Sequence, residues 1–152
     1  MDNYEMLLEK AESRGLSVKE KPLEYNDGRI RGNKILIRST IPTRRQKAAI
    51  LCEELGHYET AVGNILDQSI TANRKQELRG RIWAYNRLIG LTGILRAYKA
   101  GCRNRYEMAE CLDVPEETLQ EALDYYRSRY GICTQIDNYV IYFEPLGVME
   151  MI

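Results

Sequence analysis

The sequence contains few of the residues that build the commonest metal and redox sites. Its 152 residues include a single histidine, and the four cysteines form no CxxC pair. A zinc ribbon or a disulfide framework is therefore disfavoured, and we expect reduced cysteines that serve as small hydrophobic residues. The formal net charge is zero, so the chain as a whole lacks the basic excess of a dedicated nucleic-acid binder.

Long apolar runs are absent as well. The most apolar stretch, residues 88–95, is interrupted by Gly90 and Gly93 and is too short to span a bilayer. The start of the chain is acidic and has neither the basic region nor the apolar core of a signal peptide. Hydrophobic residues make up 44% and charged residues 29%. These are ordinary globular values, and we expect a soluble, cytoplasmic protein.

Hydrophobic periodicity predicts an order of helix, strands, helices and short strands, which is typical of an α+β domain followed by a small helical lobe. Thr43 and Gln46 form a capping box that begins the longest of these helices. The predicted elements, in chain order, are a helix at 3–14 ending at Gly15, strands within 16–40, a helix from Thr43 to about Val62 ending at Gly63, a helix from about Asn73 to Leu88, two helices within 104–129, and a strand or hairpin within 132–143 around Asp137 and Asn138.

Charge is distributed unevenly along the second half of the chain. Residues 74–105 contain nine Lys or Arg and one acid, whereas residues 106–126 contain seven acids and no Lys or Arg. Two interpretations remain open. Either the two segments attract each other or are simply solvated, or the first lines a basic groove for an acidic partner.

Two carboxylates and the only histidine share one face of the helix that Thr43 begins. At about 100° per residue, Glu53 lies about 40° to one side of His57, and Glu54 lies about 60° to the other side. Ile50 falls on the same arc, so we expect a partly apolar, partly buried setting for the three polar side chains. Buried carboxylates need a metal ion, an arginine or hydrogen-bond donors as partners. Taken alone, this spacing also suits a helix that carries the three residues for structural reasons.

The surrounding sequence resembles a known family. Residues 45–58, RQKAAILCEELGHY, are similar to the active-site helix of the ImmA/IrrE metallopeptidases, which shows an apolar run followed by H-E-[LI]-G-H. That family also shows a following helix with a Glu, an Asp or Asn four residues later, and then an aromatic-Ala pair. In this chain those places hold Glu77, Arg81 and Trp83-Ala84. The resemblance covers residues 3–95, and residues 102–150 look like the C-terminal part of prophage members of the family.

The resemblance implies an architecture in two parts. Residues 1–95 would form a zincin-like minimal metallopeptidase core, with an N-terminal helix, a small sheet and two active-site helices. Residues 96–152 would form a helix-turn-helix-like lobe with terminal strands, packed on the core.

The resemblance also implies a role for each residue of the site. His57 and Glu77 match metal ligands, and Glu54 matches the general base that activates water on a zinc ion. Glu53 takes the first-ligand position, where the family has histidine. A carboxylate can bind zinc, but a site of Glu53, His57 and Glu77 is more anionic and less suited to zinc than the usual ligand set.

Arg81 stands where the family has an Asp or Asn, the residue expected to orient the first histidine. In this chain Glu53 replaces the first histidine and Arg81 replaces its Asp or Asn partner. The two replacements carry opposite charges. We therefore expect an ion pair between Glu53 and Arg81 in place of the first metal ligand, which would leave zinc affinity poor. Further candidates are Asp67 as a ligand, and Tyr58 and Tyr85 as oxyanion donors. A turn role for Asp67 and packing roles for the tyrosines are the plainer interpretations.

The family resemblance implies a regulatory function. Many members are encoded by phages and integrating elements and act as antirepressors that cleave a helix-turn-helix repressor. The first alternative is an inactive pseudo-enzyme that binds a protein partner through the same groove. The second is a DNA-binding regulator built on residues 105–124. It is disfavoured because the would-be recognition helix begins with Glu116, Glu117 and Glu121 and offers no Arg or Lys to the bases.

Overall fold

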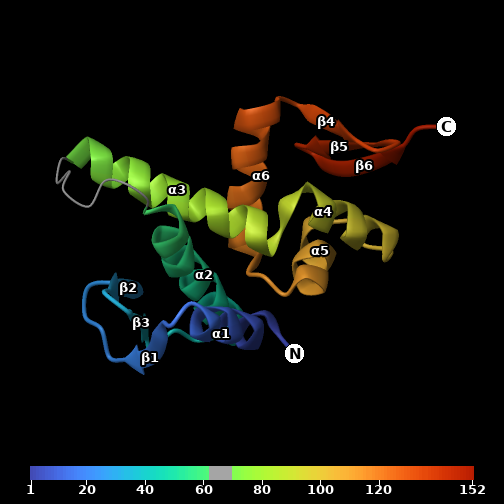
Figure 1. Ribbon diagram of the computed structural model, residues 1–152. Helices are drawn as coiled ribbons and strands as arrows, with labels where there is room; N and C mark the ends of the chain where they lie inside the picture. Colours follow the sequence, from blue (N-terminus) through green and yellow to red (C-terminus); the bar gives the residue numbers. More distant parts are fainter. Residues whose placement is uncertain (62–69) are drawn as a thin grey trace. The chain divides into compact units, whose positions relative to one another are not determined.

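The computed structural model describes residues 1–61 and 70–152. Within these residues the chain forms six helices and six strands, which confirms the predicted α+β class (Figure 1). The chain divides into two compact units, Met1–Ala84 and Tyr85–Ile152. None of the described helices is both long enough and apolar enough to cross a membrane.

The sequence analysis drew the division at residue 95, whereas the structure groups residues 85–95 with the second unit. The reason is that the last turn of one long helix packs within that unit. The Tyr85 hydroxyl donates to Glu121 at 3.3 Å, and the Tyr126 hydroxyl donates to Asn86 at 3.0 Å.

The first unit combines a small sheet with helices. Its elements are α1 (Asn3–Ser13), β1 (Ser17–Lys21), β2 (Gly28–Arg31), β3 (Lys34–Arg38), α2 (Arg44–Thr60) and the greater part of α3 (Ile70–Leu88). The sheet order is β1-β3-β2, with β1 parallel and β2 antiparallel to the central β3. Strand β2 is therefore an edge strand, and its outer backbone groups have no neighbouring strand in this sheet.

The core of the first unit lies between the sheet and its helices. In β3 the side chains of Ile35 and Ile37 are fully buried, as expected for a strand with one face on a core. Helix α1 contributes Leu7 and Ala11, and α2 contributes Leu51 and Leu55. Figure 1 shows α1 and α2 beside the sheet.

Helix α2 begins as the sequence predicts. The Thr43 side chain accepts from the Gln46 backbone N–H at 3.1 Å, and the Gln46 side chain accepts from the Thr43 backbone N–H at 3.2 Å, so the capping box is confirmed. The helix ends at Thr60 with Ala61 as its C-cap. The predicted stop at Val62 and Gly63 lies outside the described residues.

The second unit contains three further helices and a three-stranded sheet. Its elements, besides the end of α3, are α4 (Gly90–Lys99), α5 (Arg105–Leu112), α6 (Glu116–Tyr130), β4 (Cys133–Ile136), β5 (Tyr139–Phe143) and β6 (Leu146–Glu150). The sheet is antiparallel in the order β4-β5-β6. The predicted pair of helices and the predicted hairpin are confirmed, whereas α4 and β6 were not predicted.

Two glycines explain why α4 escaped the sequence analysis. Gly90 and Gly93 interrupt the apolar stretch at 88–95, where the sequence predicts no further helix. In the structure Gly90 has a φ of 64°, a conformation that favours glycine, and it turns the chain between α3 and α4. Gly93 is buried inside α4, where an added Cβ would lie 3.5 Å from the Leu112 side chain. Gly90 therefore serves a turn, whereas a Cβ at Gly93 would make only an ordinary van der Waals contact.

Candidate metal centre

Helix α2 places three ionisable side chains on one face, as its periodicity predicts. Glu54 is buried, with 7% of its surface exposed, and Glu53 and His57 are partly buried. The start of β2 covers Glu54, because a Cβ added at Gly28 would lie 2.6 Å from Ile50 Cγ2 and 3.2 Å from Glu54 Cγ. The three groups therefore have the partly apolar setting that the sequence analysis expected.

Helix α3 adds Glu77 to this group. Glu53, His57 and Glu77 each offer one ligand atom, and these atoms lie within 4.8 Å of one another. Ligand atoms around a tetrahedral zinc ion are about 3.4 Å apart, given metal–ligand distances of about 2.1 Å. The cluster would therefore need only small side-chain adjustments to surround a divalent cation.

The two nitrogens of His57 have different surroundings. Nδ1 lies 3.4 Å from Glu54 Oε2, a long hydrogen bond. Nε2 is buried and, within the described residues, has no hydrogen-bond partner. A buried polar atom without a partner is uncommon and calls for a functional explanation. A histidine that ligates a metal through one nitrogen commonly holds a carboxylate with the other, and Nδ1 of His57 faces such a carboxylate.

The Glu54 carboxylate raises the pKa of the His57 imidazole, and burial opposes this shift. The carboxylate favours the charged form of the ring, whereas a metal ion needs the neutral form. A proton and a metal ion would therefore compete for His57.

Two glycines allow α2 and α3 to cross at close range beside the site. A Cβ at Gly56 would clash with the backbone of Gly80, whose carbonyl carbon would lie 3.0 Å away. A Cβ at Gly80 would in turn lie 2.7 Å from His57 Nε2 and collide with the ring carbon next to it. The absence of side chains at both positions therefore lets the helices touch and leaves room for the imidazole.

The Arg81 guanidinium contacts two of the three candidate ligands. Its Nε lies 3.2 Å from Glu53 Oε1, which is the pairing that the charge swap in the sequence led us to expect. Its Nη2 lies 3.8 Å from Glu77 Oε2, a second contact that was not predicted. Burial raises the pKa of Glu53, and Arg81 partly offsets this effect.

These residues fit a divalent cation in type and position, because an imidazole and two carboxylates converge, and the imidazole has a buried nitrogen without a partner in the part of the chain that the structure describes. The same carboxylates already have a positive partner in Arg81. The site therefore differs from a plain three-ligand centre, in which the ligands' partners would be neutral or acidic groups.

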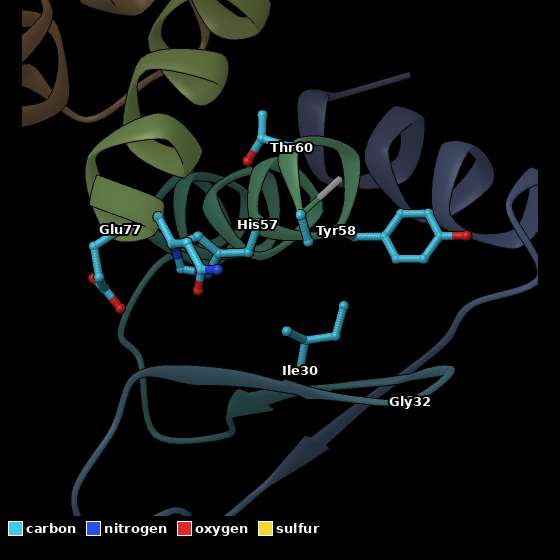
Figure 2. Close-up of a pocket in the computed structure, with 8 residues that line it drawn as sticks. Ile30, Gly32, His57, Tyr58, Thr60 and Glu77 are labelled. Atoms are coloured by element: carbon cyan, nitrogen blue, oxygen red, sulfur yellow. The ribbon is translucent and has the colours of Figure 1, made fainter. Parts of the chain in front are cut away.

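A cleft of about 740 Å³ opens next to this cluster. Figure 2 shows His57 and Glu77 close together at one end, the Tyr58 ring extending toward the other end, and Ile30 rising from the strand opposite. Ile30 and Gly32 bring the edge of the sheet to the cleft. The full lining is Ile30, Gly32, His57, Tyr58, Thr60, Ala61, Gln76 and Glu77.

The sequence analysis missed the sheet side of the cleft and the role of the glycines. Gly56 and Gly80 had a usable signal, since glycine inside a helix is unfavourable by about 1 kcal/mol and suggests close packing. Ile30 and Gly32 had none, because their position depends on which strand takes the edge. Of the other candidates, Tyr58 lines the cleft, the Tyr85 hydroxyl donates to Glu121, and Asp67 lies outside the described residues.

The start of α6 contains the acids that disfavour DNA binding. Arg105 Nη2 lies 3.0 Å from Glu116, and the Arg105 side chain also bonds to Gln120. Glu116 and Glu117 occupy the first turn of this helix, where carboxylates are favourable because of the helix dipole. These contacts give the acids a structural role within the second unit.

No protein-family model matches the chain, and no curated protein matches it. The likeness to the ImmA/IrrE peptidases therefore depends on the residues quoted from the sequence.

Proposed function

We propose that the chain is a metal-dependent, ImmA/IrrE-like peptidase that acts on a protein, as a regulatory antirepressor directed at a helix-turn-helix repressor. The observation that carries this proposal is the cluster of Glu53, His57 and Glu77 beside a cleft, in which His57 has a buried Nε2 with no partner among the described residues. A structural histidine would be expected to satisfy both nitrogens. The repressor as substrate comes from the family resemblance alone.

Glu53, His57 and Glu77 would hold the metal ion. A bound divalent cation would act as a Lewis acid on a peptide carbonyl and on water. The resemblance gives Glu54 the role of accepting the proton from the attacking water. Its burial beside His57 lets the same carboxylate orient the imidazole through Nδ1.

The edge strand supports a peptide as the substrate. An extended peptide can add to an exposed sheet edge through main-chain hydrogen bonds. Ile30 and Gly32, at and just beyond the end of β2, line the cleft next to the candidate metal ligands. A peptide paired with β2 would thus run past His57 and Glu77.

The test is a cleavage assay with a set of helix-turn-helix repressor domains, with the metal content of the protein measured in parallel. Purified protein should contain a divalent metal, and His57→Ala should lose it. Glu54→Gln should keep the metal and the fold but lose at least about 100-fold in cleavage rate. Glu59→Gln, on the same helix but outside the cleft, is the matched control. Equal cleavage by Glu54→Gln and the parent would refute the peptidase mechanism.

A second candidate function is a binding module without catalysis. The observation that favours it is the ion pairing of Arg81 with both Glu53 and Glu77, which gives two of the three candidate ligands a positive partner other than a metal ion. This candidate predicts that metal-free protein binds its partner as tightly as metal-treated protein does. The peptidase predicts that a metal chelator abolishes its effect on the partner.

A further inference from the structure

We propose that Arg81 is a built-in competitor of the metal ion, a guanidinium that occupies the two carboxylate positions until a divalent cation displaces it. This inference deepens the proposed function, since it uses the same metal site, and it assigns to Arg81 the control of metal loading.

The position of Arg81 suits a competitor of the metal ion, because its guanidinium contacts both candidate carboxylate ligands. Glu77 and Arg81 are one helical turn apart on α3, and Glu53 lies on α2. The guanidinium therefore lies between the two helices with Glu53 at 3.2 Å and Glu77 at 3.8 Å. Both carboxylates also belong to the ligand cluster with His57. A metal ion that used both carboxylates would have to share them with the guanidinium, which faces Glu53 Oε1 and Glu77 Oε2, or displace it.

Charge leads to the same conclusion. Two carboxylates facing one guanidinium carry a net charge of −1, and adding a divalent cation beside the guanidinium would place two cations within a few ångströms of each other. Like charges at this distance repel strongly in a partly buried setting. Arginine stays protonated at any physiological pH, so the repulsion is relieved only when the side chain swings out.

The exposure of Arg81 allows that movement. Its side chain is 54% exposed, so it can leave the carboxylates for solvent without unpacking a core. Ion pairs of this exposure contribute little stability. The guanidinium is thus held well enough to lower metal affinity but loosely enough to be displaced.

The experiment is a zinc titration of the full-length, metal-stripped protein against a chromophoric chelator, for the parent, Arg81→Gln and Arg79→Gln. Arg79 lies on the same helix, is exposed, and lies about 200° from Arg81 around the helix axis. Arg81→Gln should bind zinc up to about 10-fold more tightly than the parent, because the two weak ion pairs of Arg81 no longer have to be broken. Arg79→Gln should match the parent.

Thermal unfolding provides a readout that is independent of the chelator. Zinc should raise the Tm of Arg81→Gln more than that of the parent, because tighter binding to the folded state stabilises it more. Adding His57→Ala to Arg81→Gln should abolish both effects. If Arg81→Gln does not fold, Arg81→Lys keeps the charge, cannot bridge the two carboxylates, and should show an intermediate gain in affinity.

The outcomes separate this proposal from the proposed function. Unchanged or weaker zinc binding by Arg81→Gln, with a parent that binds zinc and cleaves, would overturn the competitor role and leave the peptidase standing. A gain in zinc affinity without cleavage of any repressor would support the competitor role and count against the peptidase. Zinc binding by neither protein would overturn both.

Discussion

Helices α2 and α6 use their buried faces in opposite ways. The 17-residue α2 buries Glu54, and its His57 Nε2 has no partner among the described residues. The 15-residue α6 buries Leu119, Ala122, Leu123 and Tyr126, and the Tyr126 hydroxyl both accepts from Gly90 N and donates to Asn86. Helix α6 satisfies the hydroxyl of its buried Tyr126, whereas α2 leaves Nε2 of His57 without a partner among the described residues. We infer that α6 is built for stability and that α2 gives up some stability for chemistry.

The largest expected effect is on the free energy of unfolding, at the point where helices α2 and α3 touch. Gly56→Ala should destabilise the protein by about 3 kcal/mol or more, because the added methyl group meets the Gly80 backbone, which cannot move aside. Urea unfolding followed by circular dichroism measures this loss. Gly147→Ala, at a position with open space around it, is the control. A change below about 0.5 kcal/mol at Gly56 would show that the helices do not touch there.

The next effect tests the satisfied polar atom of α6. Tyr126→Phe should reduce the free energy of unfolding by about 1–2 kcal/mol, because the Gly90 N–H and the Asn86 side chain both lose a buried partner. Tyr130→Phe, on the same helix but 44% exposed, should change it little. Equal effects of the two substitutions would remove the contrast between α6 and α2.

A smaller effect concerns the start of α2. Thr43→Ala should cost about 1 kcal/mol, because the Gln46 backbone N–H loses its side-chain acceptor. Thr43→Ser keeps the hydroxyl and should be nearly neutral. Helix α6 has Pro115 as its N-cap and no side-chain cap hydrogen bond, so its first turn depends on packing and on the favourable charges of Glu116 and Glu117. Unfolding curves of the two Thr43 variants that overlap would show that the cap contributes nothing.

The smallest effect disappears in acid. A hydrogen bond from Arg44, the first residue of α2, and a second from the Glu5 backbone lower the pKa of Asp2 to about 2 from 3.8. Because the folded-state pKa is the lower one, Asp2 stabilises the fold above about pH 4, and this contribution is lost as the pH falls toward 2. Asp2→Asn should lower the Tm at pH 5 and converge with the parent near pH 2. Glu12→Gln is the control, and parallel Tm curves for Asp2→Asn and the parent would contradict the assignment.

Local signals in the sequence were sufficient for most helix ends. The Thr43–Gln46 capping box and the stop at Gly15 involve residues within one turn of each other, so their chemistry can be read directly from the sequence. Pairings between distant residues could not be read in this way. The parallel alignment of β1 with β3, and the added strand β6, depend on the whole fold.

The candidate site could be predicted from the sequence only where its residues share one helix or match the family pattern. Glu53, Glu54 and His57 share one helix, so periodicity alone placed them on one face. Glu77 and Arg81 came from the family resemblance, and the structure brings both to Glu53. Predicting the opposite wall of the cleft requires knowing that β2 is the outermost strand of its sheet. No local sequence pattern encodes this order.

The contact between Gly80 and the His57 ring ties two distant positions together. Any residue larger than glycine at position 80 would occupy the space of the imidazole. In any chain that keeps this crossing, a side chain at position 80 therefore requires that the ring at position 57 be lost or moved. The reverse does not hold, because losing the ring permits a side chain at position 80 without requiring one.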